Sequence, residues 1–82
     1  MRYEVEFLPV ALRQLRALPR EARRLIGVKI EHLQNDLTGD VKKLQGFKHK
    51  YRLRAGNYRV LFELESACVV IYDVGDRKDI YE

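Results

Sequence analysis

The sequence has little of the residue types that small proteins use for crosslinks, metal sites or covalent catalysis. It contains one cysteine, Cys68, and so cannot form an internal disulfide. Its two histidines, His32 and His49, have no second ligand at a spacing typical of a metal site. The only serine, Ser66, falls in a predicted turn, which argues against a serine–histidine–aspartate arrangement. The sequence therefore predicts no metal, no cofactor and no cysteine or serine nucleophile.

Long apolar runs are also missing. No segment approaches the roughly 20 apolar residues that a membrane-spanning helix requires. Residues 1–7 are interrupted by Glu4 and Glu6, so they cannot serve as the apolar core of a signal peptide. We expect a cytoplasmic protein that does not associate with a membrane.

The residues that are present suit one small basic domain. A chain of 82 residues has room for a single domain, which we place at residues 1–82. Its hydrophobic fraction of 46% is sufficient for a core. The net charge of +4 and the pI of about 9.4 favour anionic partners, nucleic acid first.

The apolar pattern predicts a strand followed by two helices. Residues 2–7 alternate polar and apolar side chains, as a strand does. Leucines then recur every third residue in a short helix over about 10–18, which Pro19 ends. From Pro19 a second helix should run to the region 35–39. Its apolar stripe comprises Ala22, Ile26, Ile30, Leu33 and Leu37.

The second half of the chain predicts three strands. Residues 40–50 form a basic connection, residues 51–64 a β-hairpin and residues 68–74 the last strand, after a turn at 66–67. The unbroken apolar run of the last strand indicates that both of its faces are covered. The expected fold is α+β, strand–helix–helix–three strands, with a mainly antiparallel sheet and a helical hairpin packed on one face.

The hairpin aligns three arginines. If Gly56 and Asn57 form the loop, Arg54 lies opposite Arg59 and Arg52 opposite Leu61. The three arginines then share one exposed face. The core face carries Tyr51, Leu53, Ala55, Tyr58, Val60, Phe62 and Leu64. Directly opposed like charges destabilise a sheet, so this arrangement favours an anion site over a merely solvated surface.

Four segments in this order closely resemble the RelE/ParE superfamily of bacterial toxins, nearest its RelE branch. They are Lys43–Gly46, Tyr51–Arg54, Gly56–Val60 and Gly75–Tyr81. The opening Phe7-x-Pro9-x-Ala11 pattern and the Leu15-x-x-Leu18-Pro19 junction are also similar to that family, so the resemblance covers essentially the whole chain.

The resemblance implies a toxin of a type II toxin–antitoxin system that enters the ribosomal A site and cleaves messenger RNA without a metal. A cognate antitoxin would neutralise it by wrapping around it. Matching positions imply that Arg59 contacts the scissile phosphate and that Arg77 stabilises charge or assists the leaving group. Tyr81 would stack on or orient the nucleotide and help to activate the nucleophile. We expect further RNA phosphate contacts from Lys43, Lys50, Arg52 and Arg54.

Two departures from the family pattern limit the proton chemistry. Arg52 and Arg54 fall where the best-known members have lysines, and arginine remains protonated, so neither can act as a base. Asp76 replaces a histidine that many members carry before the tail arginine. His49 could supply a group titrating near neutrality only if it reaches the site. Otherwise Tyr81 is the best candidate for proton transfer.

Two other functions are compatible with the same fold. A ParE-like protein would poison DNA gyrase and would not need Arg59, Arg77 and Tyr81 together. A non-catalytic RNA-binding module would keep the basic helices and hairpin and would lose nothing without Tyr81. For the ribosome-dependent toxin, we expect Arg23, Arg24, Lys42 and Lys43 to lie away from the site and to serve docking on ribosomal RNA.

Overall fold

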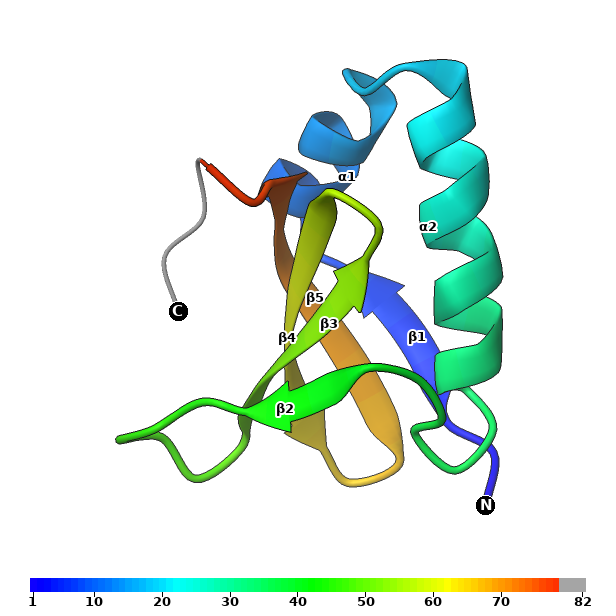
Figure 1. The fold of residues 1–82 in the computed structure, drawn as a ribbon. Coiled ribbons are helices and arrows are strands. Elements are labelled where there is room, and N and C mark those ends of the chain that lie inside the picture. Colours follow the sequence, from blue (N-terminus) through cyan, green and yellow to red (C-terminus); the bar gives the residue numbers. More distant parts are fainter. Residues whose placement is uncertain (79–82) are drawn as a thin grey trace.

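Two helices and five strands follow one another along residues 1–78, which are the residues that the computed structural model describes (Figure 1). In chain order they are β1 (Glu4–Phe7), α1 (Pro9–Arg16), α2 (Arg20–Leu33), β2 (Val41–Lys43), β3 (Lys50–Ala55), β4 (Tyr58–Glu65) and β5 (Cys68–Asp76). Pro9 starts α1, where its fixed φ suits the first helical turn. Pro19 directly precedes α2, so the proline separates the two helices as predicted.

The strands form one mixed sheet in the order β1-β5-β4-β3-β2. Only β1 and β5 run parallel, and the other neighbours are antiparallel. The predicted α+β class with a mainly antiparallel sheet is therefore confirmed. The segment 40–50 was predicted only as a connection, and this was incomplete. Its residues Val41–Lys43 pair with Leu53, Arg52 and Tyr51 as strand β2.

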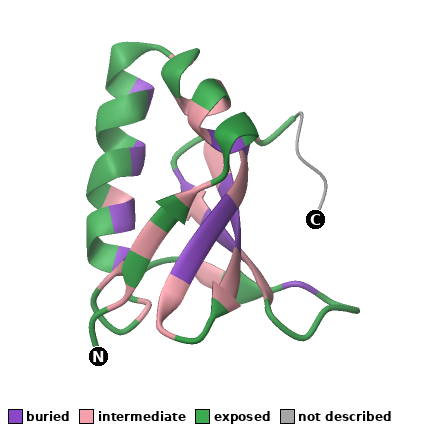
Figure 2. Ribbon diagram, turned by 180° about the vertical axis from the view of Figure 1, so that it is seen from behind, coloured by how far each residue is buried: buried purple, intermediate pink, exposed green. Residues whose placement is uncertain are grey.

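Both helices pack on one face of the sheet. The α1 helix lies against β5 and β1, and α2 lies against β3 and β4. Figure 2 shows that the buried positions of α2 face the sheet. They are Ala22, Ile26, Ile30 and Leu33, four of the five positions of the predicted stripe. The fifth, Leu37, lies outside the helix, because α2 ends at Leu33 and Leu37 has a φ of +58°. From the sheet, the core receives Leu53, Ala55, Val60, Phe62, Val69, Ile71 and Val74.

A tight turn fixes how β3 and β4 pair. Gly56 has a φ of +60°, while Asn57 keeps a negative φ, and this pattern is typical of a II′ hairpin turn. A Cβ atom on Gly56 would lie 2.9 Å from Leu25 Cδ2 of α2, so the position also lacks room for a side chain. The resulting register is the predicted one, with Arg54 opposite Arg59 and Ala55 opposite Tyr58.

A β-bulge interrupts the pairing of β4 with β5. Leu61 pairs with Asp73, but the next residue, Phe62, pairs with Ile71. Tyr72 is therefore an extra residue in β5 with no partner position on β4. Its side chain packs with Leu44 and Leu61 in a second, small apolar cluster, separate from the main core.

Candidate functional site

The hairpin places three arginines on the side of the sheet that faces away from the helices. Arg54 lies directly opposite Arg59, and Arg52 lies opposite Leu61. The alternate positions Leu53 and Val60 are fully buried beneath the helices, so the predicted division of the hairpin into two faces is confirmed. We call the side that carries Arg52, Arg54 and Arg59 the arginine face.

Arg52 is not exposed as predicted, because only 5% of its surface is accessible. The unpredicted strand β2 explains the difference. Lys42 of β2 lies beside Arg52 on one side, and Leu61 of β4 lies beside it on the other. The Arg52 side chain is therefore enclosed within the arginine face, while Arg54 and Arg59 are half-buried.

Arg77 joins this group from the segment after β5. Its backbone N–H donates to the Asn57 carbonyl oxygen at 2.9 Å, which extends the β4–β5 pairing beyond Asp76. Burial lowers the pKa of Arg59 from its ordinary value, and the positive charges of Arg52, Arg54 and Arg77 lower it further. The four guanidinium groups thus interact electrostatically, as expected of a site built for an anion.

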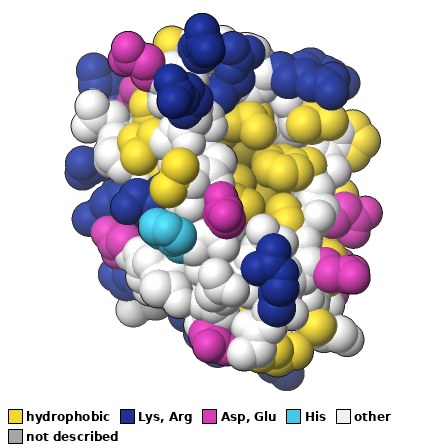
Figure 3. All heavy atoms as spheres, turned by 90° about the vertical axis from the view of Figure 1, so that its right-hand side faces the viewer, with side chains coloured by type: hydrophobic (Ala, Val, Ile, Leu, Met, Phe, Trp, Pro, Cys, Tyr) yellow, Lys and Arg dark blue, Asp and Glu magenta, His cyan; other side chains and the backbone are white. Residues whose placement is uncertain are grey.

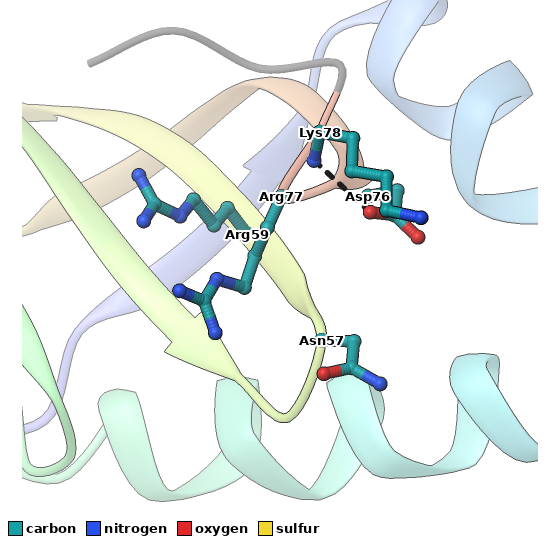
Figure 4. A pocket seen from close by; sticks show the side chains of 5 residues that line it. All are labelled: Asn57, Arg59, Asp76, Arg77 and Lys78. Carbon is teal, nitrogen blue, oxygen red and sulfur yellow. Dashed lines mark hydrogen bonds between the residues drawn. The ribbon is translucent and has the colours of Figure 1, made fainter.

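An open hollow of about 490 Å³ lies at this end of the sheet. It is lined by Asn57, Arg59, Asp76, Arg77 and Lys78. In Figure 4 the side chains of Arg59 and Arg77 extend to the same side, away from Asp76, Lys78 and Asn57. The Asp76 carboxylate instead accepts a hydrogen bond from the Lys78 backbone N–H at 3.0 Å, which holds the chain just after Arg77. The hollow lies within the volume range of about 300–1,000 Å³ typical of ligand sites.

Asp40 forms an ion pair with Arg54. Its Oδ2 lies 3.9 Å from Arg54 Nη1, and its carbonyl oxygen accepts the Arg54 backbone N–H at 3.0 Å. Both side chains are partly exposed, so this ion pair contributes little to stability. Asp40 orients Arg54 and leaves an excess of positive charge on the arginine face.

The two predicted lysines lie away from the hollow. Lys50 is on the arginine face at the opposite end of β3, with its Nζ 4.6 Å from the Phe47 ring centroid and 5.2 Å from that of Tyr72. Lys43 pairs with Tyr51, a position of the core face. It lines a separate hollow of about 190 Å³ with Lys42, Leu44 and Gln45. Of the predicted site residues that the structure describes, only the four arginines therefore come together.

The groups that could transfer a proton are few near the hollow. Tyr81 lies outside the described residues, so its role stays a prediction. His49 is exposed, and its carbonyl accepts from the Leu64 N–H at the far end of the hairpin from Arg77. Burial raises the pKa of Tyr72, and Asp73 and Glu63 add to this effect. The Tyr72 phenol is thus a poor base.

Neither a metal cluster nor a reactive thiol is found among residues 1–78. No three His, Cys, Asp or Glu side chains in this range lie together in a way that could hold a metal ion. Burial raises the pKa of the Cys68 thiol, as do the negative charges of Glu6, Glu4 and Glu65, so the thiol stays protonated. Neither described helix is long and apolar enough to cross a membrane.

Two residues of the hollow escaped the sequence analysis. Lys78 follows Arg77 directly, and its position next to a predicted site residue was a usable signal. Asn57 was predicted only as a turn residue, yet its carbonyl anchors Arg77. The two residues are separated by strands β4 and β5, and no local sequence pattern predicts a hydrogen bond between a turn carbonyl and a backbone N–H so far along the chain.

Comparisons with known proteins show the family to which the chain belongs. Residues 5–81 match the family described as the ParE toxin of the type II toxin–antitoxin system parDE. Toxin RelE3 of Methanocaldococcus jannaschii is 34% identical over 84 residues, covering 96% of this chain and 96% of that protein.

Solved structures extend the likeness to the fold. In the RelB–RelE antitoxin–toxin complex of Methanococcus jannaschii, one chain superposes with a TM-score of 0.79 at 32% identity, covering 93% of this chain and 94% of that one. A chain of the archaeal RelE–RelB complex of Pyrococcus horikoshii gives the same TM-score at 25% identity, covering 98% and 100%. This chain therefore belongs to the RelE/ParE superfamily of toxins of type II toxin–antitoxin systems.

Proposed function

We propose that this protein is a ribosome-dependent endoribonuclease that cleaves messenger RNA in the A site and so inhibits translation. The observation that carries the proposal is the convergence of Arg59 and Arg77 on one hollow, with Arg54 and Arg52 beside them. A row of opposed arginines costs stability in the free protein and gains it when a phosphate binds. The RelE relatives support the same activity, and a cytoplasmic location goes with it.

The reaction that suits this site is an intramolecular transesterification of the RNA backbone. The 2′-hydroxyl oxygen attacks the neighbouring phosphorus, a P–O2′ bond forms, and the P–O5′ bond breaks. The products are a 2′,3′-cyclic phosphate and a 5′-hydroxyl, and the 2′ proton is balanced by one delivered to O5′. Arg59 and Arg77 would donate hydrogen bonds to the non-bridging oxygens as their charge increases. No metal ion is needed for these steps.

Tyr81 is the candidate for proton transfer or base stacking, and two substitutions separate these roles. Tyr81→Phe keeps the ring and removes the hydroxyl, while Tyr81→Ala removes both. If proton transfer is its role, both variants should cleave slowly in single turnovers on saturated ribosomes. A normal rate for Tyr81→Phe with a slow rate for Tyr81→Ala would make Tyr81 a stacking platform.

We also propose a cognate antitoxin as the protein partner, since the structural relatives are complexes of RelE with RelB. Acidic antitoxin residues would meet the arginine face or displace the segment after Arg77. Figure 3 shows that apolar side chains also gather on the α2 side of the molecule, and Leu25 and Val28 of α2 are 37% and 49% exposed. An affinity that does not change between low and high salt would contradict an electrostatic mode of binding.

A ParE-like gyrase poison is the second candidate, because the matching family description names ParE. Brief expression without antitoxin, followed by primer extension on messenger RNA, separates the two functions. We expect growth arrest with cuts inside codons, and no cuts from Arg59→Ala. Intact messenger with DNA breaks would establish gyrase poisoning, and ribosome binding without any cleavage would establish a non-catalytic RNA-binding module.

A further inference from the structure

The bulge in β5 decides on which side of the sheet Arg77 lies. Before the bulge, Val69 and Ile71 point into the main core. Strict alternation beyond Ile71 would send residues 73, 75 and 77 to that same core face. The extra residue at Tyr72 reverses the alternation, so that Val74 is buried in the core and Gly75 lies opposite Arg59. Arg77 follows two residues later and so shares the face of Arg59.

One side chain from α1 holds the bulge. Gln14 Nε2 donates to Asp73 Oδ1 at 2.8 Å, and Gln14 Oε1 accepts the Val74 backbone N–H at 2.9 Å. Both bonds are partly buried. The amide thus engages two consecutive residues of β5, immediately after the extra residue and three positions before Arg77.

The two bonds matter because β5 has no neighbouring strand on this side beyond Ile71, where the pairing with β1 ends. Val74 lies opposite Val60 of β4 on the other side, and a buried N–H without an acceptor is costly. Gln14 supplies that acceptor from outside the sheet. It also fixes the Asp73 carboxylate, which would otherwise be free to turn toward the cations of the arginine face.

We propose that Gln14 is a positioning residue for Arg77: it clamps the β5 bulge and so keeps the Arg77 guanidinium beside Arg59. The inference rests on the proposed function for the role of Arg77 in catalysis. Gln14 itself touches no substrate. Its contribution is the accuracy with which one charged group is held, and a misplacement of about 1 Å can cost about 10²-fold in rate.

The test uses variants of Gln14 and of its hydrogen-bond partner Asp73. Gln14→Ala removes both bonds, and Gln14→Glu keeps the acceptor for Val74 but sets a carboxylate against Asp73. The double variant Gln14→Glu/Asp73→Asn restores the pair with the donor and acceptor reversed, and it leaves the net charge of wild type unchanged. Gln34→Ala is the matched control, because Gln34 Nε2 donates to the Tyr3 carbonyl at 3.1 Å, at the N-terminal end of the sheet.

Single-turnover cleavage on saturated ribosomes is the functional measurement. We expect both Gln14 single variants to lower the rate by about 10- to 100-fold with little change in ribosome affinity. The exchanged pair should recover to within a few-fold of wild type, and Gln34→Ala should cleave normally. Amide hydrogen exchange should also quicken at Val74 and Arg77 in Gln14→Ala and return toward wild type in the exchanged pair.

Two results would contradict the proposed positioning role of Gln14. One is an amide hydrogen exchange rate at Val74 and Arg77 that is the same in Gln14→Ala as in wild type. The other is an equal loss of cleavage in Gln14→Ala and Gln34→Ala, since this would mean that lowered stability alone is responsible. If wild type itself does not cleave, the proposed function fails, while the exchange measurement still decides whether Gln14 positions the Arg77 segment.

Discussion

At the scale of single residues, Arg59 is the centre of the charge arrangement. It lies opposite Arg54 in the hairpin, and Arg77, which follows β5, lines the same hollow. The Arg59 guanidinium therefore has two like-charged neighbours. Burial lowers the pKa of Arg59 from its ordinary value, and this repulsion lowers it further. Arginine nevertheless stays protonated at physiological pH, so the repulsion is relieved by an anion and not by loss of a proton.

This arrangement predicts that oxyanions stabilise the protein through Arg59. We expect sulfate to bind the folded state and so to raise the Tm of wild type more than chloride does at equal ionic strength. The difference between the two salts should shrink in Arg59→Gln. Arg20→Gln, an exposed arginine at the start of α2, is the control and should keep the wild-type difference. Identical salt responses in wild type and Arg59→Gln would exclude Arg59 from an anion site.

The same residue also predicts a kinetic effect. Arg59→Ala should lower single-turnover cleavage by about 10²–10³-fold, the usual cost of losing one preorganised donor to a transition-state oxyanion. Ribosome affinity should fall far less, because many other cations contribute to docking. A variant that loses affinity and rate in equal proportion would instead make Arg59 a binding residue.

At the scale of the elements, the β3–β4 turn is the feature that we expect to be most sensitive to substitution. Gly56→Ala places a side chain at a φ of +60° and against Leu25, so we expect the protein to lose about 1–2 kcal/mol in unfolding free energy. Gly27→Ala is the matched control, since nothing lies within 4 Å of its added Cβ in the α2 interior. That control should gain up to about 1 kcal/mol. Urea denaturation measures both, and equal effects would contradict the account of the turn.

The elements that sequence predicted well are those with local rules. The hairpin register followed from a two-residue loop, because loop length fixes which residues face each other. The α2 stripe followed from helical periodicity over four turns. Local rules alone were therefore sufficient to place Arg54 opposite Arg59.

The elements that sequence did not predict depend on distant partners. The strand β2 has three residues, too few to show an alternating pattern, and it exists because Tyr51–Leu53 offers an unpaired edge. The bulge at Tyr72 lies in an apolar run in which every position looks alike. Gln14 acts on β5 from the other half of the chain, and nothing around it in the sequence indicates that contact.

At the scale of the whole molecule, positive charge is spread over two regions. One is the arginine face, and the other is the junction of α1 and α2, where the exposed side chains are Arg13, Arg16, Arg20, Arg23 and Arg24. Figure 3 shows basic side chains gathered along the upper edge of the molecule on the α2 side. The separation suggests two tasks, chemistry at the first region and docking on ribosomal RNA at the second.

Salt dependence distinguishes these tasks. Arg23→Ala and Arg24→Ala should each weaken ribosome binding modestly and lower the slope of log K against log salt by about one unit per lost phosphate contact. Neither should change the single-turnover rate on saturated ribosomes. Unaltered slopes in both variants would mean that other surfaces dock on the ribosome.

The position of β5 in the sheet has a consequence for how the toxin is made. This strand lies between β1 and β4 and carries Val69, Ile71 and Val74 of the core, yet it is synthesised after the other helices and strands of residues 1–78. Until it emerges, β1 has no neighbour and both helices lack much of their packing surface, so the nascent chain cannot fold in stages. We expect stalled chains ending before Cys68 to be digested by protease and chains with β5 outside the exit tunnel to resist it. Folding of the whole domain therefore waits for β5 to leave the exit tunnel.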